Sequence, residues 1–299
     1  MNNRVKAAFV GRDGIRAGWR LLLFVLGAWI AAQILFAILT HGFGYKPQEG
    51  WHPFDFTIEG ILNLIVILSA AALMTRIEKK SFADYGLPFG SAFGFRFWWG
   101  LLWGFLASTL VFLATWAAGG VTFSGFALHG RELVMSALVW IPAWLMLGLF
   151  EEFFYRGYAL ATLSSSMGFW PTSFLLSAIF GALHYFVKPM ESWMDALNVG
   201  LFGLFWCFTL RRTGDLWFAI GFHAISDYAD LMIYAAPNTG NNGMSLTGHL
   251  LNVTYHGPSW LTGGVCGMEA SVITLVALAA LFALFHRLCP MAQFPAATH

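Results

Sequence analysis

Hydrophobic runs long enough to cross a membrane recur along nearly the whole chain, and short polar segments separate them. The hydrocarbon core of a bilayer is about 30 Å thick, so a spanning helix needs about 20 mostly apolar residues. Eight runs reach or approach this length: 19–40, 57–75, 98–118, 133–164, 169–186, 193–210, 215–236 and 270–288. The pattern therefore predicts an all-α polytopic membrane protein, a bundle of about eight transmembrane helices.

Composition supports the membrane assignment and excludes other classes. Hydrophobic residues make up 58% of the chain and charged residues 10%, with a mean hydropathy of +0.67, whereas soluble domains contain about 25% charged residues. The net charge of +1 argues against a nucleic-acid surface. The three cysteines are widely spaced, so they indicate neither a disulfide framework nor a cysteine-based zinc site.

The basic residues orient the predicted helices, because Lys and Arg concentrate in cytoplasmic loops. With a cytoplasmic N-terminus, thirteen of the sixteen fall on the cytoplasmic side and three, Lys46, Arg131 and Lys188, on the other. The first run lacks a closing cleavage site, so we expect a retained helix rather than a signal peptide. The thirteen are Arg4, Lys6, Arg12, Arg16, Arg20, Arg76, Lys79, Lys80, Arg96, Arg156, Arg211, Arg212 and Arg287. We expect a multi-pass protein of the cell (inner) membrane with both termini in the cytoplasm.

The whole chain, 1–299, is expected to form a single transmembrane helical domain. Most connections between the runs are short, such as the Arg-Arg-Thr-Gly stretch at 211–214. The stretch at about 237–269 is long and rich in Gly, Asn and Thr. Long loops in compact domains often have functional roles. We expect an exported loop that covers one end of the bundle and could gate access to it.

Two adjacent carboxylates and an arginine interrupt the fourth run, in the stretch 149–156. Ionisable groups at membrane depth usually pair, face a polar interior or take part in chemistry. On an α-helix, residues four apart share a face, whereas adjacent residues diverge by about 100°. Glu152 and Arg156 are therefore expected to pair. Glu151 points elsewhere, unpaired, and becomes the candidate for chemistry.

Two later runs contain further polar residues at membrane depth. His223 and Asp227 share one face of the seventh run, and Phe180 and His184 share a face of the fifth. If the fourth helix restarts after Pro142, Glu151, His184 and His223 each lie within about one or two helical turns of the bilayer middle. We expect one polar cavity. Such a set can activate water against a carbonyl, hold a metal ion or relay protons.

These residues resemble the motifs of the CPBP family of intramembrane proteases, which unites CAAX proteases with bacteriocin-processing enzymes and includes the Ras-converting CAAX endopeptidase in its superfamily. The resemblance is strong over 133–228, and it places a protease-like core at about 133–236. It implies that Glu152 and Arg156 form a structural pair that positions the helix. The motifs are EExxxR at Glu151, Glu152 and Arg156, FxxxH at Phe180 and His184, and HxxxD at His223 and Asp227.

The resemblance also implies roles for the remaining motif residues. Glu151 would activate water, His184 would hold that water beside it, and His223 with Asp227 would form the oxyanion side of the site. Many relatives have Asn at the last position. A carboxylate cannot donate a hydrogen bond unless it is protonated, so Asp227 either carries a proton, orients His223 or belongs to a metal site. No cofactor is expected. The alternative is a divalent metal such as zinc, held by these four residues.

The sequence therefore predicts an intramembrane endopeptidase that hydrolyses a peptide bond of a membrane-associated protein or peptide. One alternative is a metal-dependent version of the same protease. Another is a proton-coupled transporter that uses the buried Glu and His residues, although the chain lacks the repeated half expected of transporters. A scaffold without chemistry is a third. The expected partners are the substrate and the lipid bilayer, with no nucleic acid and no prediction of oligomeric state.

Overall fold

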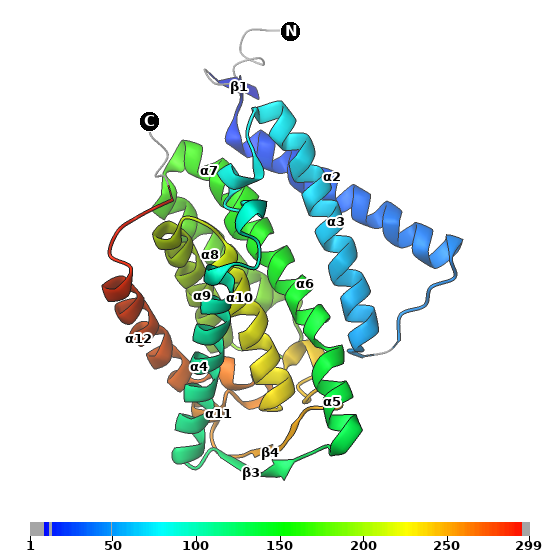
Figure 1. Ribbon diagram of the computed structural model, residues 1–299, viewed down its shortest axis with the longest axis vertical. Helices are drawn as coiled ribbons and strands as arrows, with labels where there is room; N and C mark the ends of the chain where they lie inside the picture. The colour runs from blue at the N-terminus through cyan, green and yellow to red at the C-terminus, as the bar shows by residue number, and fades with distance from the viewer. Residues whose placement is uncertain (1–8, 12–13, 49, 295–299) are drawn as a thin grey trace.

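The computed structural model describes residues 9–11, 14–48 and 50–294, and most of it is helical (Figure 1). This confirms the predicted all-α fold class. Six helices in the described residues are long and apolar enough to cross a membrane, and each coincides with a predicted run. They are Ala17–Gly42, Pro53–Glu78, Phe95–Ala117, Gly130–Met167, Phe169–Val187 and Trp193–Thr213.

The two remaining predicted runs form shorter helices. In the seventh, α10 (Trp217–Asp227) continues into the π-helix η5 (Tyr228–Ile233), and the eighth is α12 (Val272–Leu288). All eight runs are thus helical. The longer helices are α2 (Ala17–Ala37) with η1 (Ile38–Gly42), α3 (Pro53–Glu78), α4 (Phe95–Ala117), α5 (Gly130–Val139), α6 (Ile141–Glu151) with η4 (Glu152–Ala159) and α7 (Leu160–Met167), α8 (Phe169–Val187) and α9 (Trp193–Thr213).

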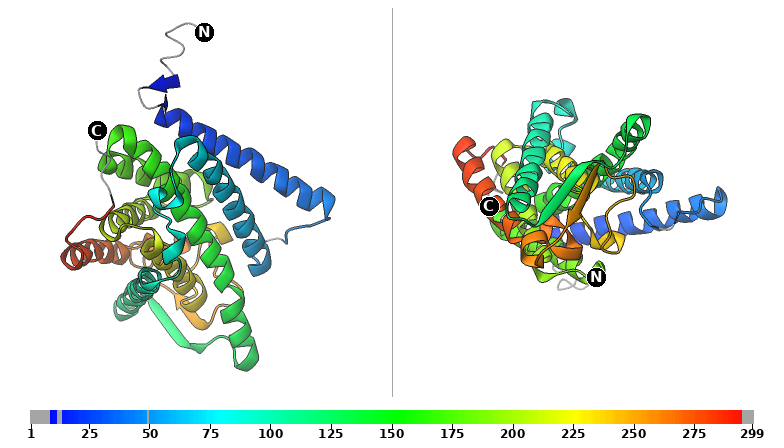
Figure 2. Two further views of the ribbon diagram at one scale, coloured as in Figure 1. Left: turned by 45° about the horizontal axis from the view of Figure 1, so that its top comes forward. Right: turned by 90° about the horizontal axis from the view of Figure 1, so that it is seen from below.

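The first and last described segments lie at the same end of the bundle. Ion pairs connect the ends of the helices there. Arg20 at the start of α2 pairs with Glu78 at the end of α3, and Arg96 at the start of α4 pairs with Asp215 before α10. We call this the basic end. From it, α2 diverges from the bundle in every view (Figures 1 and 2).

At the opposite end, the connection after α4 pairs with the long segment 237–269. Strands β3 (Val121–Phe126) and β4 (Leu251–Tyr255) are antiparallel, in the register that places Val121 opposite Tyr255. The short helix α11 (Ser259–Thr262) follows β4. The segment predicted to be an exported loop is therefore folded against this end of the bundle.

Close packing of α4 on α10 fixes the helix that contains the HxxxD motif. A β-carbon at Gly100 or Gly104 of α4 would overlap the backbone carbonyls of Phe218 and Phe222 in α10. Gly221 makes the reciprocal approach to α4. Small residues at such crossings let helix backbones approach closely in membranes.

Two details of the predicted topology were wrong, the location of Arg156 and the end of the sixth helix. Arg156 was assigned to a cytoplasmic segment, but its side chain is 2% exposed inside the bundle. The stretch 211–213 is the last turn of α9 rather than a connector, and the helix ends at Gly214, whose φ of 89° favours glycine. Arg4, Lys6 and Arg12 lie outside the described residues.

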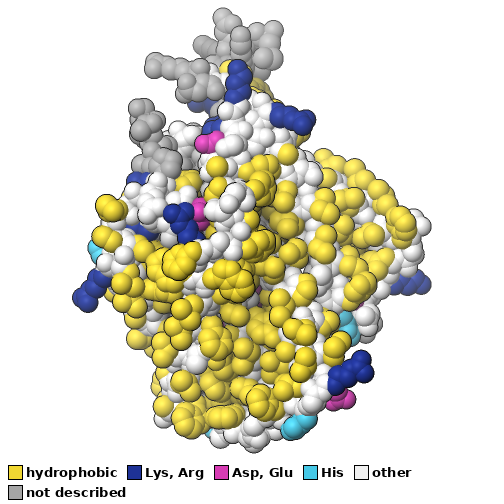
Figure 3. All heavy atoms as spheres, in the orientation of Figure 1, with side chains coloured by type: hydrophobic (Ala, Val, Ile, Leu, Met, Phe, Trp, Pro, Cys, Tyr) yellow, Lys and Arg dark blue, Asp and Glu magenta, His cyan; other side chains and the backbone are white. Residues whose placement is uncertain are grey.

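With these corrections, nine described Lys and Arg residues lie at the basic end and three, Lys46, Arg131 and Lys188, at the opposite end. Figure 3 shows the dark blue side chains gathered mainly on the upper part of the molecule. The nine are Arg16, Arg20, Arg76, Lys79, Lys80, Arg96, Arg211, Arg212 and Arg287.

Candidate active site

The helix that contains the two adjacent carboxylates is interrupted on both sides of them. α5 ends at Val139 and α6 begins at Ile141 with Pro142 in its first turn, where a missing backbone N–H costs least. From Glu152 to Ala159 the helix widens into the π-helix η4. Turns of this kind inside α-helices often occur at functional sites. The sequence analysis assumed a restart after Pro142, whereas the helix restarts at Ile141, and it did not predict the π-helix.

Glu152 is the centre of a buried polar cluster. Its Oε1 atom accepts a hydrogen bond from Nη1 of Arg156 at 3.0 Å and lies 2.8 Å from Nδ1 of His223. The Arg156 guanidinium also lies over the rings of Phe180 and Trp206, at 4.3 and 5.0 Å from their centroids. The expected contact between Glu152 and Arg156 is therefore present. The contact with His223, which comes from a different helix, could not be derived from helical spacing.

His223 lies between this cluster and the other two carboxylates. Its ring is stacked on Trp206, with centroids 4.3 Å apart and an interplanar angle of 13°. Because Glu152 already accepts from a guanidinium, it is best described as an ionised acceptor, and Nδ1 of His223 donates to it. The opposite ring nitrogen, Nε2, is 3.4 Å from Oδ2 of Asp227 and 3.8 Å from Oε2 of Glu151.

His184 is oriented by its own helix. Its Nδ1 atom is 2.9 Å from the backbone carbonyl of Phe180, one turn earlier in α8. A carbonyl oxygen can only accept, so Nδ1 is the donor, and Nε2 of the neutral ring is left as an acceptor. The ring of Phe180 contacts the imidazole edge-on at 4.6 Å. The FxxxH motif thus sets both the tautomer and the orientation of His184.

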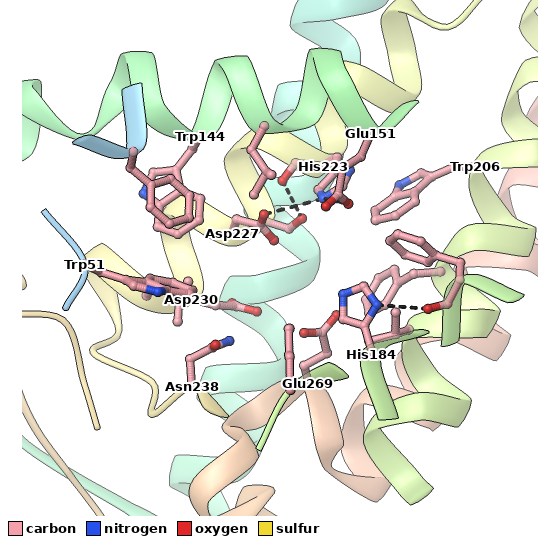
Figure 4. Close-up of a pocket in the computed structure, with 18 residues that line it drawn as sticks. Trp51, Trp144, Glu151, His184, Trp206, His223, Asp227, Asp230, Asn238 and Glu269 are labelled. Carbon is pink, nitrogen blue, oxygen red and sulfur yellow. Dashed lines mark hydrogen bonds and ion pairs between the residues drawn. The ribbon is translucent and has the colours of Figure 1, made fainter. Parts of the chain in front are cut away.

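Glu151, His184, His223 and Asp227 all line one cavity of about 180 Å³ (Figure 4). They come from α6, α8 and α10, so the structure brings together residues that the sequence analysis placed on three separate helices. A water molecule occupies about 30 Å³ in the liquid. The cavity therefore has room for several waters or for a short length of peptide backbone.

Five polar residues that the sequence analysis did not select as site residues also line this cavity: Lys188, Ser226, Asp230, Asn238 and Glu269. Lys188 is one helical turn beyond His184, and Asp230 is three residues beyond Asp227, so spacing from the motifs could have found both. Asn238 and Glu269 come from the two ends of the segment 237–269, which no local pattern connects to the site. Burial raises the pKa of Glu269 to about 7.

Two histidines and several carboxylates in one cavity raise the question of a metal site. Within the described part of the chain, no group of three or more His, Cys, Asp and Glu side chains is arranged to hold a metal ion. Ligand nitrogen and oxygen atoms lie about 2.0–2.2 Å from zinc, which requires them to converge on one point. Nδ1 of both histidines is hydrogen-bonded to Phe180 and Glu152, so only Nε2 of each ring could serve as a ligand. In the described residues the side chains do not converge on one point as such a centre requires.

The segment that contains Glu151, His184, His223 and Asp227 is similar to a known protein family. Residues 133–229 match the Rce1-like family, described as type II CAAX prenyl endopeptidase Rce1-like. The match confirms the resemblance to CAAX proteases. Neither the comparison with curated proteins nor that with solved structures found a match. The Rce1-like segment runs from the first turn of α5 into η5 and supports a protease that acts in the membrane.

Proposed function

We propose that this protein is an intramembrane endopeptidase that hydrolyses a peptide bond of a membrane-associated protein or peptide with water activated by Glu151. The contrast between the two adjacent carboxylates is the main support. Glu152 is fully buried and neutralised by Arg156, whereas the Glu151 side chain is 20% exposed and lines the cavity. The first has a structural environment, and the second has access to water.

The reaction begins with a water molecule between Glu151 and His184. Nε2 of His184 accepts a hydrogen bond from this water, which directs one lone pair at the substrate carbonyl carbon. Glu151 takes a proton as the oxygen–carbon bond forms. When the tetrahedral intermediate collapses and the carbon–nitrogen bond breaks, Glu151 returns the proton to the leaving amine. Water is consumed, and one carboxylic acid and one amine are released.

The oxyanion develops on the opposite side of the cavity, next to His223. A hydrogen-bond donor fixed at that position stabilises the transition state more than the substrate. Nδ1 is occupied by Glu152, so the donor is Nε2 of His223 in its protonated form, or the carboxyl group of Asp227 when that group carries the proton. Stacking on Trp206 keeps the ring in place without a reorganisation cost during the reaction.

The test compares the membrane peptidome of cells that express the native protein with that of cells that express Glu151→Gln. Loss of a general base lowers the rate by about 10²–10⁴-fold, so cleavage products should disappear while the protein accumulates normally. Glu132→Gln is the matched control, because Glu132 is an exposed carboxylate of α5 that does not line the cavity. Products that persist unchanged in Glu151→Gln would refute the proposal.

A further inference from the structure

The two ends of the bundle carry different numbers of basic residues, and this difference assigns them to the two sides of the membrane. Nine of the described Lys and Arg residues lie at the basic end and three at the opposite end. An excess of this size marks the cytoplasmic side. The opposite end, where β3 pairs with β4, is then extracytoplasmic.

The cavity is closed toward the basic end. The residues that separate the Glu152 cluster from that end are packed in one hydrophobic core. Phe153, Tyr158, Leu210, Trp217 and Ile220 belong to it, and each is at most 3% exposed. A route for a peptide through this layer would require the core itself to open, at the cost of its packing.

Toward the extracytoplasmic end, the cavity wall continues to the ends of the helices. His184 lies three residues before the end of α8, and Lys188 lies just beyond it. Trp51 precedes α3, and Asn238 and Glu269 belong to the segment that folds over this end. Figure 4 shows Trp51, Asn238 and Glu269 on the side of the cavity away from Glu151. The mouth is therefore built from extracytoplasmic segments.

We infer that the cavity opens to the extracytoplasmic side, and that its substrates are membrane-anchored polypeptides whose cleaved segment lies on that side. The substrate class rests on the proposed hydrolysis, whereas the direction of opening does not. The inference excludes peptides presented at the cytoplasmic face, including newly made C-terminal lipopeptides that have not crossed the membrane. Residues of the segment 237–269 contribute to the mouth, so exported substrates meet this segment first.

Thiol labelling tests the direction of opening. In a parent whose Cys207, Cys266 and Cys289 are replaced by alanine, single cysteines are introduced as Asn238→Cys at the mouth and Ser226→Cys deeper in the cavity. A membrane-impermeant sulfonated maleimide is added to sealed right-side-out or inside-out vesicles.

Two exposed positions outside the cavity provide the reference reactions. Thr247→Cys lies in the segment 237–269, and Ser91→Cys lies in the connection between α3 and α4 at the basic end. We expect Asn238→Cys and Ser226→Cys to react in right-side-out vesicles together with Thr247→Cys, and to lose this labelling in inside-out vesicles. Ser91→Cys should show the reverse.

The inference is overturned if the cavity cysteines react in the same vesicles as Ser91→Cys. Labelling of Thr247→Cys in inside-out vesicles overturns it as well, since the orientation is then reversed. Failure of both cavity cysteines to react from the Thr247 side also overturns it. The labelling is repeated with Glu151→Gln in the same parent, because access does not need catalysis. If the parent with Glu151 intact shows the expected labelling pattern but yields no cleavage products, the proposed function is refuted and the direction of opening stands.

Discussion

The adjacent residues Glu151 and Glu152 allow a direct test of the proposed roles. The same Glu→Gln change should lower the free energy of unfolding at Glu152, whereas at Glu151 it should abolish turnover and leave stability nearly unchanged. The Glu152 side chain is 0% exposed and lies 3.0 Å from Arg156 and 2.8 Å from His223. Glu152→Gln removes the charge and leaves a guanidinium that is 2% exposed without its counter-ion. Breaking a buried pair in this way costs about 3–5 kcal/mol. We expect the unfolding free energy to fall by that amount.

At Glu151 the favourable and unfavourable contributions of the charge to the free energy of unfolding nearly cancel. Its carboxylate lies 3.8 Å from Nε2 of His223, where the Coulomb energy is about 4 kcal/mol at an effective dielectric constant of 20 and about 1 kcal/mol in water. Desolvation of the carboxylate and repulsion from Asp227 oppose this attraction, and neutral glutamine is subject to neither. The unfolding free energy of Glu151→Gln should therefore stay within about 1 kcal/mol of the native value, although turnover is lost.

The assay is unfolding of the purified protein in mixed micelles of a neutral detergent and SDS, followed by circular dichroism. Adding Arg156→Met to Glu152→Gln removes the uncompensated cation, so the double variant should recover part of the lost stability. Glu132→Gln serves again as the exposed control. Equal destabilisation by Glu151→Gln and Glu152→Gln would show that the two carboxylates do not differ in role, and would refute this reasoning.

Three further outcomes are expected. Cleavage should be insensitive to prolonged dialysis against a chelator, because the described side chains do not converge as metal ligands; loss of activity that zinc restores would favour the metal-dependent alternative. Gly203→Ala should destabilise the protein by about 1–3 kcal/mol, because its β-carbon would overlap Nη2 of Arg156, whereas Gly27→Ala, with no atom nearby, should be neutral or stabilising. Burial raises the pKa of Glu269 from 4.5 to about 7, so between these pH values the folded state keeps a proton that the unfolded state loses. The free energy of unfolding should therefore fall as pH rises from about 4.5 to about 7. The Glu269→Gln variant should lack this decline.

The fold class followed from the sequence because transmembrane helices leave a simple pattern of apolar runs. Eight runs were expected and all are helical in the structure. The contact of Glu152 with Arg156 followed from spacing within one helix. The restart assumed after Pro142 lies instead at Ile141, because proline is tolerated in the first turn of a helix. Local chemistry determines the apolar runs and the contact within one helix.

Contacts between segments could not be predicted in the same way. Glu152 and His223 are 71 residues apart, and helical periodicity indicates which face a residue occupies but not which helix that face meets. Glu269 lies in a connecting segment, where a carboxylate would normally be solvated, and it reaches the cavity because this segment folds over the end of the bundle. Asn238 reaches the cavity for the same reason.

The position of His223 also bears on whether Asp227 carries a proton. Nδ1 donates to Glu152, so only Nε2 faces the cavity, and it faces two carboxylates that accept hydrogen bonds but cannot donate them unless protonated. For Nε2 to interact favourably with either group, one proton must be shared among His223, Asp227 and Glu151. A site that splits a peptide bond with water has to store one proton and return it to the leaving amine. In the proposed reaction, aspartate in place of asparagine would therefore supply an additional carrier for that proton, on the side of the cavity where the oxyanion is proposed to form.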